Sequence, residues 1–348
     1  MIVGSRPRRG AGDAVSVAGE TSPAAPFGDR LAAAVERRGS QLVLGLDPDP
    51  SRLWARAVDA QGESRERLVT ELADIERAAG LLSGGVGRAA RLEAAAAVLA
   101  HCRAVVDAAG PACVAVKPQL ACFERLGFAG WLALEATCAH SHEQGLLVLA
   151  DGKRGDVPVT ARVYAQALVG ATRTPFGTAP GLGADAITAN PLLGGDALGP
   201  LITAARASGA GVFALVRTSN PGAADLFDLP LAAGGPLWER LAAAVQEAGV
   251  VGPVSGLADV GAVCGATAPE HLARMRELMP RTPFLLPGIG AQGGDVAALA
   301  PAVAPGRAGA LVTASRAIVD AHETAGGDPG AAARAEAERL REAAWSLA

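Results

Sequence analysis

The chain has 348 residues, 50% of them hydrophobic and 19% charged, and a formal net charge of −4 at pH 7. This size and apolar content argue for a large folded core and against extensive disorder. The weak negative charge gives no reason to expect binding to nucleic acid or acidic membranes. Because the five cysteines include no CxxC pair, we expect free thiols in a reducing cytoplasm and no metal site.

Eight short apolar segments recur along the chain, and each ends in polar or glycine-rich residues. They lie at 41–47, 112–118, 145–153, 185–191, 211–220, 259–267, 282–290 and 309–316. Segments with helical spacing separate them, for example 29–39, 128–145, 160–170 and 269–280. Alternating strands and helices pair in parallel, and eight strands predict an α/β fold, a single-domain (β/α)₈ TIM barrel. An open doubly wound sheet is the competing architecture, but no GxGxxG motif follows the first strand.

Three further segments complete the predicted organisation. We expect a flexible N-terminal tail, a barrel and a C-terminal helix that packs on the barrel, at 1–26, 27–325 and 326–348. The long gap after the first strand predicts a helical insertion around 55–110, with a mobile glycine-rich loop at 81–90. Trp345 is expected to anchor the last helix.

The most informative segment is LADGKRGDVPVT, residues 149–160. Asp151 and Lys153 are two apart at the end of a strand, so both point the same way at the barrel end that carries active sites. Asp156 and Thr160 follow in the loop and first helical turn, and the spacing brings both carboxylates near Lys153. Neighbouring carboxylates favour a protonated lysine, which could donate a proton to a carbanion. A structural ion pair is the alternative.

The two lysines of the chain support the first interpretation. Lys117 and Lys153 are its only lysines, whereas arginine supplies every other cation of this kind. This usage suggests that both positions require a compact ammonium group.

The segment DGKRGDVPVT resembles the D-x-K-x-x-D signature of the orotidine 5′-phosphate decarboxylase family, and its RG pair resembles the type 2 branch. The resemblance implies decarboxylation of orotidine 5′-phosphate to UMP and CO₂, the last step of de novo UMP synthesis, with no cofactor or metal. Lys153 would protonate C6, with Asp151 beside it. The resemblance also implies a cytoplasmic homodimer in which Asp156 and Thr160 reach the neighbouring site. Val157 stands where the family usually has Ile.

Other strand ends supply candidate ligands. Asp47, in GLDP, could simply cap a turn, but the resemblance implies a ribose ligand. Lys117 ends the second strand and could be a surface lysine, but the resemblance places it in a charge network that touches the ribose. In RTSNPG, Ser219 matches the residue that reads the pyrimidine edge. Thr218 is the alternative, and Arg217 is a neighbour.

The segment FLLPGIGAQGGD, 284–295, predicts a phosphate loop after the seventh strand. Its glycines allow close approach of an anion, and the following helix is expected to offer free N–H groups. Arg316, at the end of the eighth strand, suits phosphate because its guanidinium has a planar fork of donors. The resemblance adds Gln292 and Gly290 to the phosphate ligands.

Three alternatives remain open. A related barrel enzyme acting on a sugar phosphate (a keto-gulonate phosphate decarboxylase or hexulose phosphate synthase) shares the D-x-K-x-x-D core but uses Mg²⁺. A Schiff-base aldolase could use Lys153, although flanking carboxylates would keep it charged. A non-catalytic barrel would bind UMP without turnover.

Overall fold

The computed structural model of the chain describes residues 25–60, 62–80, 88–290 and 293–347. Residues 1–24 of the predicted tail and residues 81–87 of the predicted mobile loop therefore lie outside the described residues. Gln292 also lies outside them.

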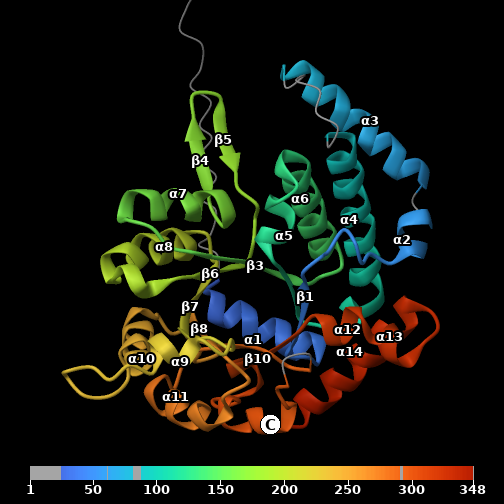
Figure 1. Cartoon of the computed structure of the whole chain (residues 1–348). Coiled ribbons are helices and arrows are strands. Elements are labelled where there is room, and N and C mark those ends of the chain that lie inside the picture. The colour runs from blue at the N-terminus through green and yellow to red at the C-terminus, as the bar shows by residue number, and fades with distance from the viewer. Residues whose placement is uncertain (1–24, 61, 81–87, 291–292, 348) are drawn as a thin grey trace, which may run out of the picture.

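Eight parallel strands close into a barrel in the order β1-β10-β9-β8-β7-β6-β3-β2, with helices around it (Figure 1). They are β1 (Leu42–Leu46), β2 (Ala115–Pro118), β3 (Leu147–Arg154), β6 (Ala186–Ala189), β7 (Gly211–Arg217), β8 (Val260–Cys264), β9 (Phe284–Pro287) and β10 (Ala310–Ala314). Each strand lies within one of the eight predicted segments or overlaps it. The predicted (β/α)₈ fold is confirmed, and the closed sheet excludes the open doubly wound alternative.

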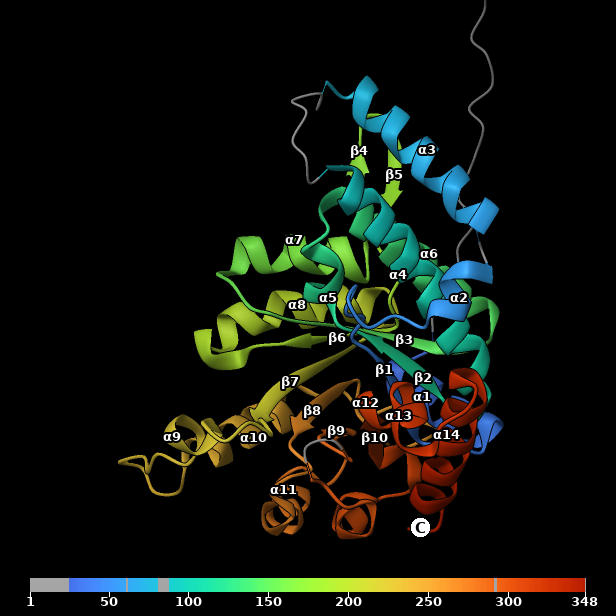
Figure 2. The same ribbon diagram turned by 45° about the vertical axis from the view of Figure 1, so that its right-hand side comes forward.

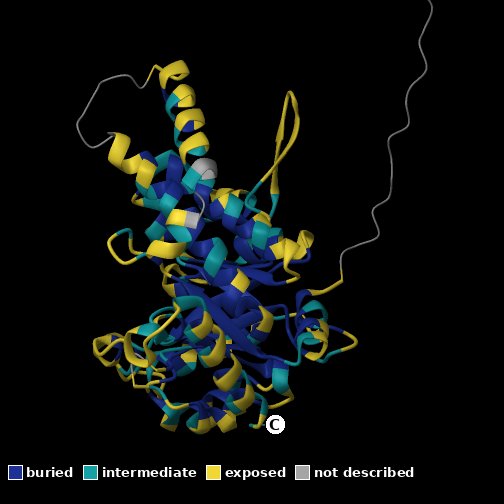
Figure 3. Ribbon diagram, turned by 90° about the vertical axis from the view of Figure 1, so that its right-hand side faces the viewer, coloured by how far each residue is buried: buried dark blue, intermediate teal, exposed yellow. Residues whose placement is uncertain are grey.

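The barrel strands are buried on both faces, which explains their continuous apolar sequences (Figure 3). Val43, Leu285 and Leu311 belong to one core cluster together with Phe27 and Phe213. Phe27 comes from α1 (Phe27–Arg38), and its ring meets the edge of Phe213 at a centroid distance of 5.9 Å. This helix therefore packs against the end of the barrel that is opposite the carboxyl ends of the strands.

The long connection after β1 forms α2 (Ala55–Ala60), α3 (Gly62–Ala78) and α4 (Arg88–Ala109). Helix α4 packs against the barrel helix α6 (Gly127–Glu143), and α3 packs on α4 at the outside of the molecule (Figure 2). The other helices are α5 (Leu120–Glu124), α7 (Pro158–Leu168), α8 (Gly195–Ala207), α9 (Ala223–Phe227), α10 (Leu237–Ala248), α11 (Leu272–Leu278), α12 (Arg316–Val319), α13 (Ala321–Ala325) and α14 (Pro329–Trp345).

Helix α14 packs against α4, α12 and α13. Its last residue, Trp345, lies under the guanidinium of Arg307, whose central carbon is 4.1 Å from the ring centroid. This cation–π contact fixes the end of the chain against the barrel.

A hairpin that the sequence pattern did not predict projects from the barrel between α7 and β6 (Figure 1). Strands β4 (Ala171–Thr174) and β5 (Gly177–Pro180) pair only with each other and are exposed throughout. The Thr174 hydroxyl bridges the turn, donating to the Gly177 carbonyl over 2.7 Å. Because neither face is buried, the hairpin has no alternation of apolar and polar residues to reveal it.

All five cysteines are free thiols, as predicted. None of the helices in the described part of the chain has the length and apolar character needed to cross a membrane.

Candidate active site

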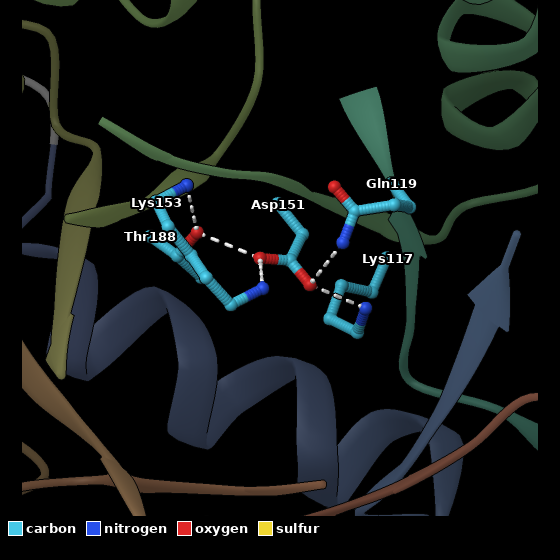
Figure 4. Close-up of polar contacts among 5 residues, drawn as sticks. All are labelled: Lys117, Gln119, Asp151, Lys153 and Thr188. Carbon is cyan, nitrogen blue, oxygen red and sulfur yellow. Dashed lines mark hydrogen bonds and ion pairs between the residues drawn. The ribbon is translucent and has the colours of Figure 1, made fainter. Parts of the chain in front are cut away.

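Five polar side chains meet at the carboxyl ends of three neighbouring barrel strands (Figure 4). Lys117 and Gln119 come from β2 and the residue after it, Asp151 and Lys153 from β3, and Thr188 from β6. The strands lie side by side in the order β6-β3-β2, so parallel pairing brings these residues to the same end of the barrel.

The Asp151 carboxylate is the centre of this group. Its Oδ2 atom accepts from Lys117 Nζ at 2.6 Å and from Gln119 Nε2 at 3.3 Å. Its Oδ1 atom accepts from Lys153 Nζ at 2.7 Å and from the Thr188 hydroxyl at 2.8 Å. Asp151 is 5% exposed, and four donors on a buried carboxylate stabilise its ionised form.

The charges of this group reinforce one another. Burial alone would raise the pKa of Asp151, but Lys117 and Lys153 outweigh it and hold that pKa well below its usual range. Burial alone would lower the pKa of Lys117, but Asp151 and Asp47 raise it overall. A carboxylate and an ammonium are therefore both charged at neutral pH, although their side chains are only 7% and 8% exposed.

Lys153 is the more accessible of the two lysines. Its side chain is 42% exposed, compared with 8% for Lys117. The structure thus confirms the predicted contact between Asp151 and Lys153. The backbone between them, however, is not the regular strand that the prediction assumed. The pairing of β3 with β6 shifts register between Ala150 and Arg154, and Lys153 has a φ of +47° within this irregularity. Lys153 is therefore the ammonium group that is more exposed to a ligand.

A cavity of about 400 Å³ opens above this group, a size typical of small-molecule sites. The predicted site residues that line it are Asp47, Lys117, Asp151, Lys153, Thr218, Ser219 and Arg316. Val263, Leu285 and Pro287 add apolar surface. One space is therefore bordered by a charged cluster, an apolar wall and a separate arginine.

The loop after β9 approaches the cavity as predicted, but the helix beyond it differs from the prediction. Gly288 lines the cavity, and Gly290 lies two residues further on with a φ of +74°. The next element is a 3₁₀ helix, Val296–Ala302, whose N-terminus is capped because Asp295 Oδ1 accepts from the Ala297 N–H at 3.1 Å. The element is therefore a 3₁₀ helix in place of the expected α-helix, and Asp295 already occupies one of its N-terminal N–H groups.

Asp156 and Thr160 do not line this cavity in their own chain. Asp156 Oδ1 accepts from the N–H of Val157 at 2.7 Å, and no ion-pair partner for Asp156 lies among the described residues. Thr160 lies in the first turn of α7 as predicted, and this helix begins at Pro158. The prediction that both carboxylates lie near Lys153 is therefore confirmed for Asp151, whereas no hydrogen bond or ion pair among the described residues joins Asp156 to Lys153 within one chain.

The loop after β7 lines the cavity with Thr218, Ser219 and Asn220. Thr218 Oγ1 donates to Asn220 Oδ1 at 2.7 Å, and the Ser219 carbonyl accepts from Thr267 Oγ1 at 3.0 Å. Arg217 does not line the cavity and instead forms two hydrogen bonds with Asp228, at 2.8 and 2.9 Å. Arg217 therefore holds the loop in place.

Gln119 and Thr188 were not predicted as site residues. Gln119 follows Lys117 by two residues, the same spacing that revealed Asp151 and Lys153. Thr188 is the hydroxyl residue inside the apolar segment at 185–191. The sequence therefore contained a feature that pointed to each residue. Assigning either one to the site also required knowing which side of its strand faces the barrel interior.

No group of three or more His, Cys, Asp or Glu side chains within the described ranges is arranged to hold a metal ion. The fold and the site define a (β/α)₈-barrel enzyme that binds its ligand above the carboxyl ends of the strands.

Comparison with known proteins agrees with this assignment. The chain belongs to the orotidine 5′-phosphate decarboxylase / HUMPS family, whose model matches residues 40–335. It is 37% identical to the orotidine 5′-phosphate decarboxylase of Rhodopirellula baltica over 301 residues, covering 85% of this chain and 89% of that protein. The resemblance inferred from the D-x-K-x-x-D segment is thereby confirmed at the level of the family.

Solved structures support the same family. The OMP decarboxylase of Leishmania donovani matches with a TM-score of 0.64 and 29% identity, covering 92% of this chain and 98% of that one. The UMP synthase of the same organism matches with a TM-score of 0.63 and 29% identity, and the chain spans 57% of its length.

Proposed function

We propose that this chain decarboxylates orotidine 5′-phosphate to UMP and CO₂, without a cofactor, as the last step of UMP synthesis. One observation carries the proposal above all. The buried Asp151 carboxylate holds the Lys117 and Lys153 ammonium groups at one side of a cavity that Arg316 also lines. The relatives named above are decarboxylases of this substrate, which favours it over a sugar phosphate.

The proposed reaction breaks one carbon–carbon bond and forms one carbon–hydrogen bond, both at C6 of the substrate. The bond between C6 and the substrate carboxylate breaks, its electron pair stays on C6, and CO₂ leaves. The Lys153 ammonium then gives its proton to C6, and the resulting amine regains a proton from solvent. The positive charges of Lys153 and Lys117, held by Asp151 before the substrate arrives, stabilise the negative charge that develops on C6.

The remaining site residues bind the substrate away from the reacting bond. Asp47 and Lys117 contact the ribose, and Ser219 reads the pyrimidine edge. Arg316, Gln292 and the backbone around Gly290 bind the phosphate. Phosphate binding far from C6 supplies energy that helps to close the site over the reacting atoms.

The active form is a cytoplasmic homodimer in which Asp156 and Thr160 enter the partner's site. The surface beside Asp156 supports this arrangement, because Val157, Val159 and Val163 are 57%, 74% and 56% exposed. Apolar side chains gathered at one end of α7 are typical of a protein–protein interface.

The experiment that tests the activity follows loss of the orotate absorbance in excess EDTA. We expect turnover by the wild-type protein and none by Lys153→Ala. Lys153→Arg is the matched variant, because it keeps the charge but a guanidinium does not readily release a proton. If the wild-type protein turns over only sugar phosphates with Mg²⁺, the chain belongs with the sister enzymes. If borohydride traps a substrate on Lys153, the aldolase alternative is correct. Binding of UMP without any turnover would indicate a non-catalytic barrel.

A second experiment tests the shared site. Lys153→Ala and Asp156→Ala are each inactive alone, but their mixed dimer contains one site with both residues intact. Random subunit exchange should therefore restore about a quarter of the wild-type activity. Failure of exchanged subunits to regain activity would mean that Asp156 serves its own chain.

A further inference from the structure

The backbone of Lys153 has an unusual conformation. Among the described residues, Lys153 is the non-glycine residue with a positive φ, +47°. The left-handed region is unfavourable for a residue with a Cβ atom and persists when neighbouring structure holds it. The register shift between β3 and β6 brackets this residue, and such bulges redirect side chains beside active sites. Something on the neighbouring strand must therefore hold this conformation.

Thr188 on β6 makes the contacts that do so (Figure 4). Its hydroxyl oxygen accepts from the backbone N–H of Lys153 at 2.8 Å and donates its own proton to Asp151 Oδ1, also at 2.8 Å. The same Oδ1 accepts from Lys153 Nζ at 2.7 Å. Thr188 is 1% exposed, so water does not readily replace either bond.

We propose that Thr188 is a positioning residue for the proton donor. One hydroxyl fixes both ends of Lys153, because it binds the backbone directly and orients the carboxylate that receives the ammonium group. Asp151 can then hold Nζ at one place in the cavity, and the lysine does not sample the other directions that its flexible stem allows. This inference rests on the proposed function, in which Lys153 protonates C6.

The test uses Thr188→Val and Thr188→Ser. Valine fills nearly the same space but leaves the Lys153 N–H and one bond to Asp151 Oδ1 unmade, whereas serine keeps both. We expect Thr188→Val to lower kcat by about 10- to 100-fold, with KM changed by less than about threefold. Thr188→Ser should stay within about threefold of wild type in kcat.

Thr137→Val is the matched control. Thr137 is 1% exposed on α6, and its hydroxyl donates to the Ala133 carbonyl at 2.7 Å. The substitution Thr137→Val removes this buried hydrogen bond, which lies outside the cavity. It should therefore lower the melting temperature and leave kcat unchanged. The inference is overturned if Thr188→Val keeps wild-type kcat, if Thr188→Ser loses as much as Thr188→Val, or if Thr137→Val reproduces the loss.

A crystal structure of Thr188→Val separates this inference from the proposed function. We expect Lys153 to leave the left-handed region or Nζ to leave Asp151. A Lys153 that keeps its positive φ and its contact with Asp151 overturns the positioning role, whatever the protein's activity. Absence of turnover in the wild-type protein, by contrast, refutes the proposed function and leaves the geometric result standing.

Discussion

Lys117 donates from its ammonium group to Oδ2 of Asp151 over 2.6 Å, and the two side chains are only 8% and 7% exposed. Taking both charges out of water is costly, and each is tolerated because the other is present. The pair is therefore both a part of the site and a condition for its stability.

Removal of Asp151 should destabilise the protein as well as inactivate it. Asp151→Ala leaves the Lys117 ammonium buried without its partner, so we expect the free energy of unfolding to fall by about 3–5 kcal/mol. The double variant Lys117→Met/Asp151→Leu should recover much of this loss and remain inactive. Urea unfolding and the decarboxylation assay measure the two effects. Equal stability of Asp151→Ala and wild type would contradict the prediction.

His101 should make the protein sensitive to mild acid. Burial, with a smaller effect of His322, lowers the pKa of His101 to about 4. Its Nδ1 accepts from the Trp54 N–H at 3.1 Å, which requires the unprotonated nitrogen. Between about pH 6.5 and pH 4 the unfolded chain binds a proton that the folded chain excludes, so stability falls as the pH falls through this range, by up to about 3 kcal/mol.

Urea titrations at pH 7.5 and pH 4.5 check this, with His101→Gln as the comparison. Glutamine can still accept from the Trp54 N–H but does not titrate, so the difference between the two pH values should shrink. An unchanged difference would assign the acid sensitivity to other groups.

Gly290 and Gly293 form a matched pair for testing the phosphate loop. Both have positive φ, +74° and +86°, so alanine strains the backbone at either position. A Cβ atom at 290 would lie 2.7 Å from the Cβ of Ala317 on α12, whereas one at 293 meets nothing within 4 Å. We expect Gly290→Ala to raise KM by about tenfold more than Gly293→Ala. Similar KM values for the two would show that loop packing on α12 does not matter for binding.

The choice between Ser219 and Thr218 can be settled by truncation of each hydroxyl. Thr218 and Ser219 both line the cavity, and the family resemblance matches Ser219 to the residue that reads the pyrimidine edge, so we expect Ser219 to make the contact with the pyrimidine. Ser219→Ala should lower kcat/KM by about 10- to 100-fold, and Thr218→Val by less than about threefold. The reverse order would transfer the role to Thr218.

The sequence predicted the barrel and most of the charged cluster because both depend on strand periodicity. Apolar segments that end in polar residues identify parallel strands and their carboxyl ends, and these ends meet in any closed barrel. Strand ends therefore put Lys117 and Asp151 at the same end of the barrel although they lie 34 positions apart in the sequence, and the family resemblance put both in one charge network. Rare lysines in an arginine-rich chain added an independent signal.

The remaining features depend on interactions that sequence spacing does not encode. The bulge at Lys153 depends on the hydroxyl of Thr188 from another strand. Asp295 is a residue type that favours an N-cap, but the glycine-rich spacing before it did not reveal that the capped element would be a 3₁₀ helix. Asp156 lies outside the cavity of its own chain, and sequence spacing does not encode which side chains a loop directs away from the site.

The lysine content of the chain has a practical consequence for spectroscopy. Both lysines bind the same carboxylate, and the chain contains no others. Selective ¹⁵N labelling of lysine side chains should therefore give just two ammonium signals, and both come from this site. A ligand, a change of pH or a substitution at Thr188 could then be followed at the individual ammonium groups, without assignment of the rest of the spectrum.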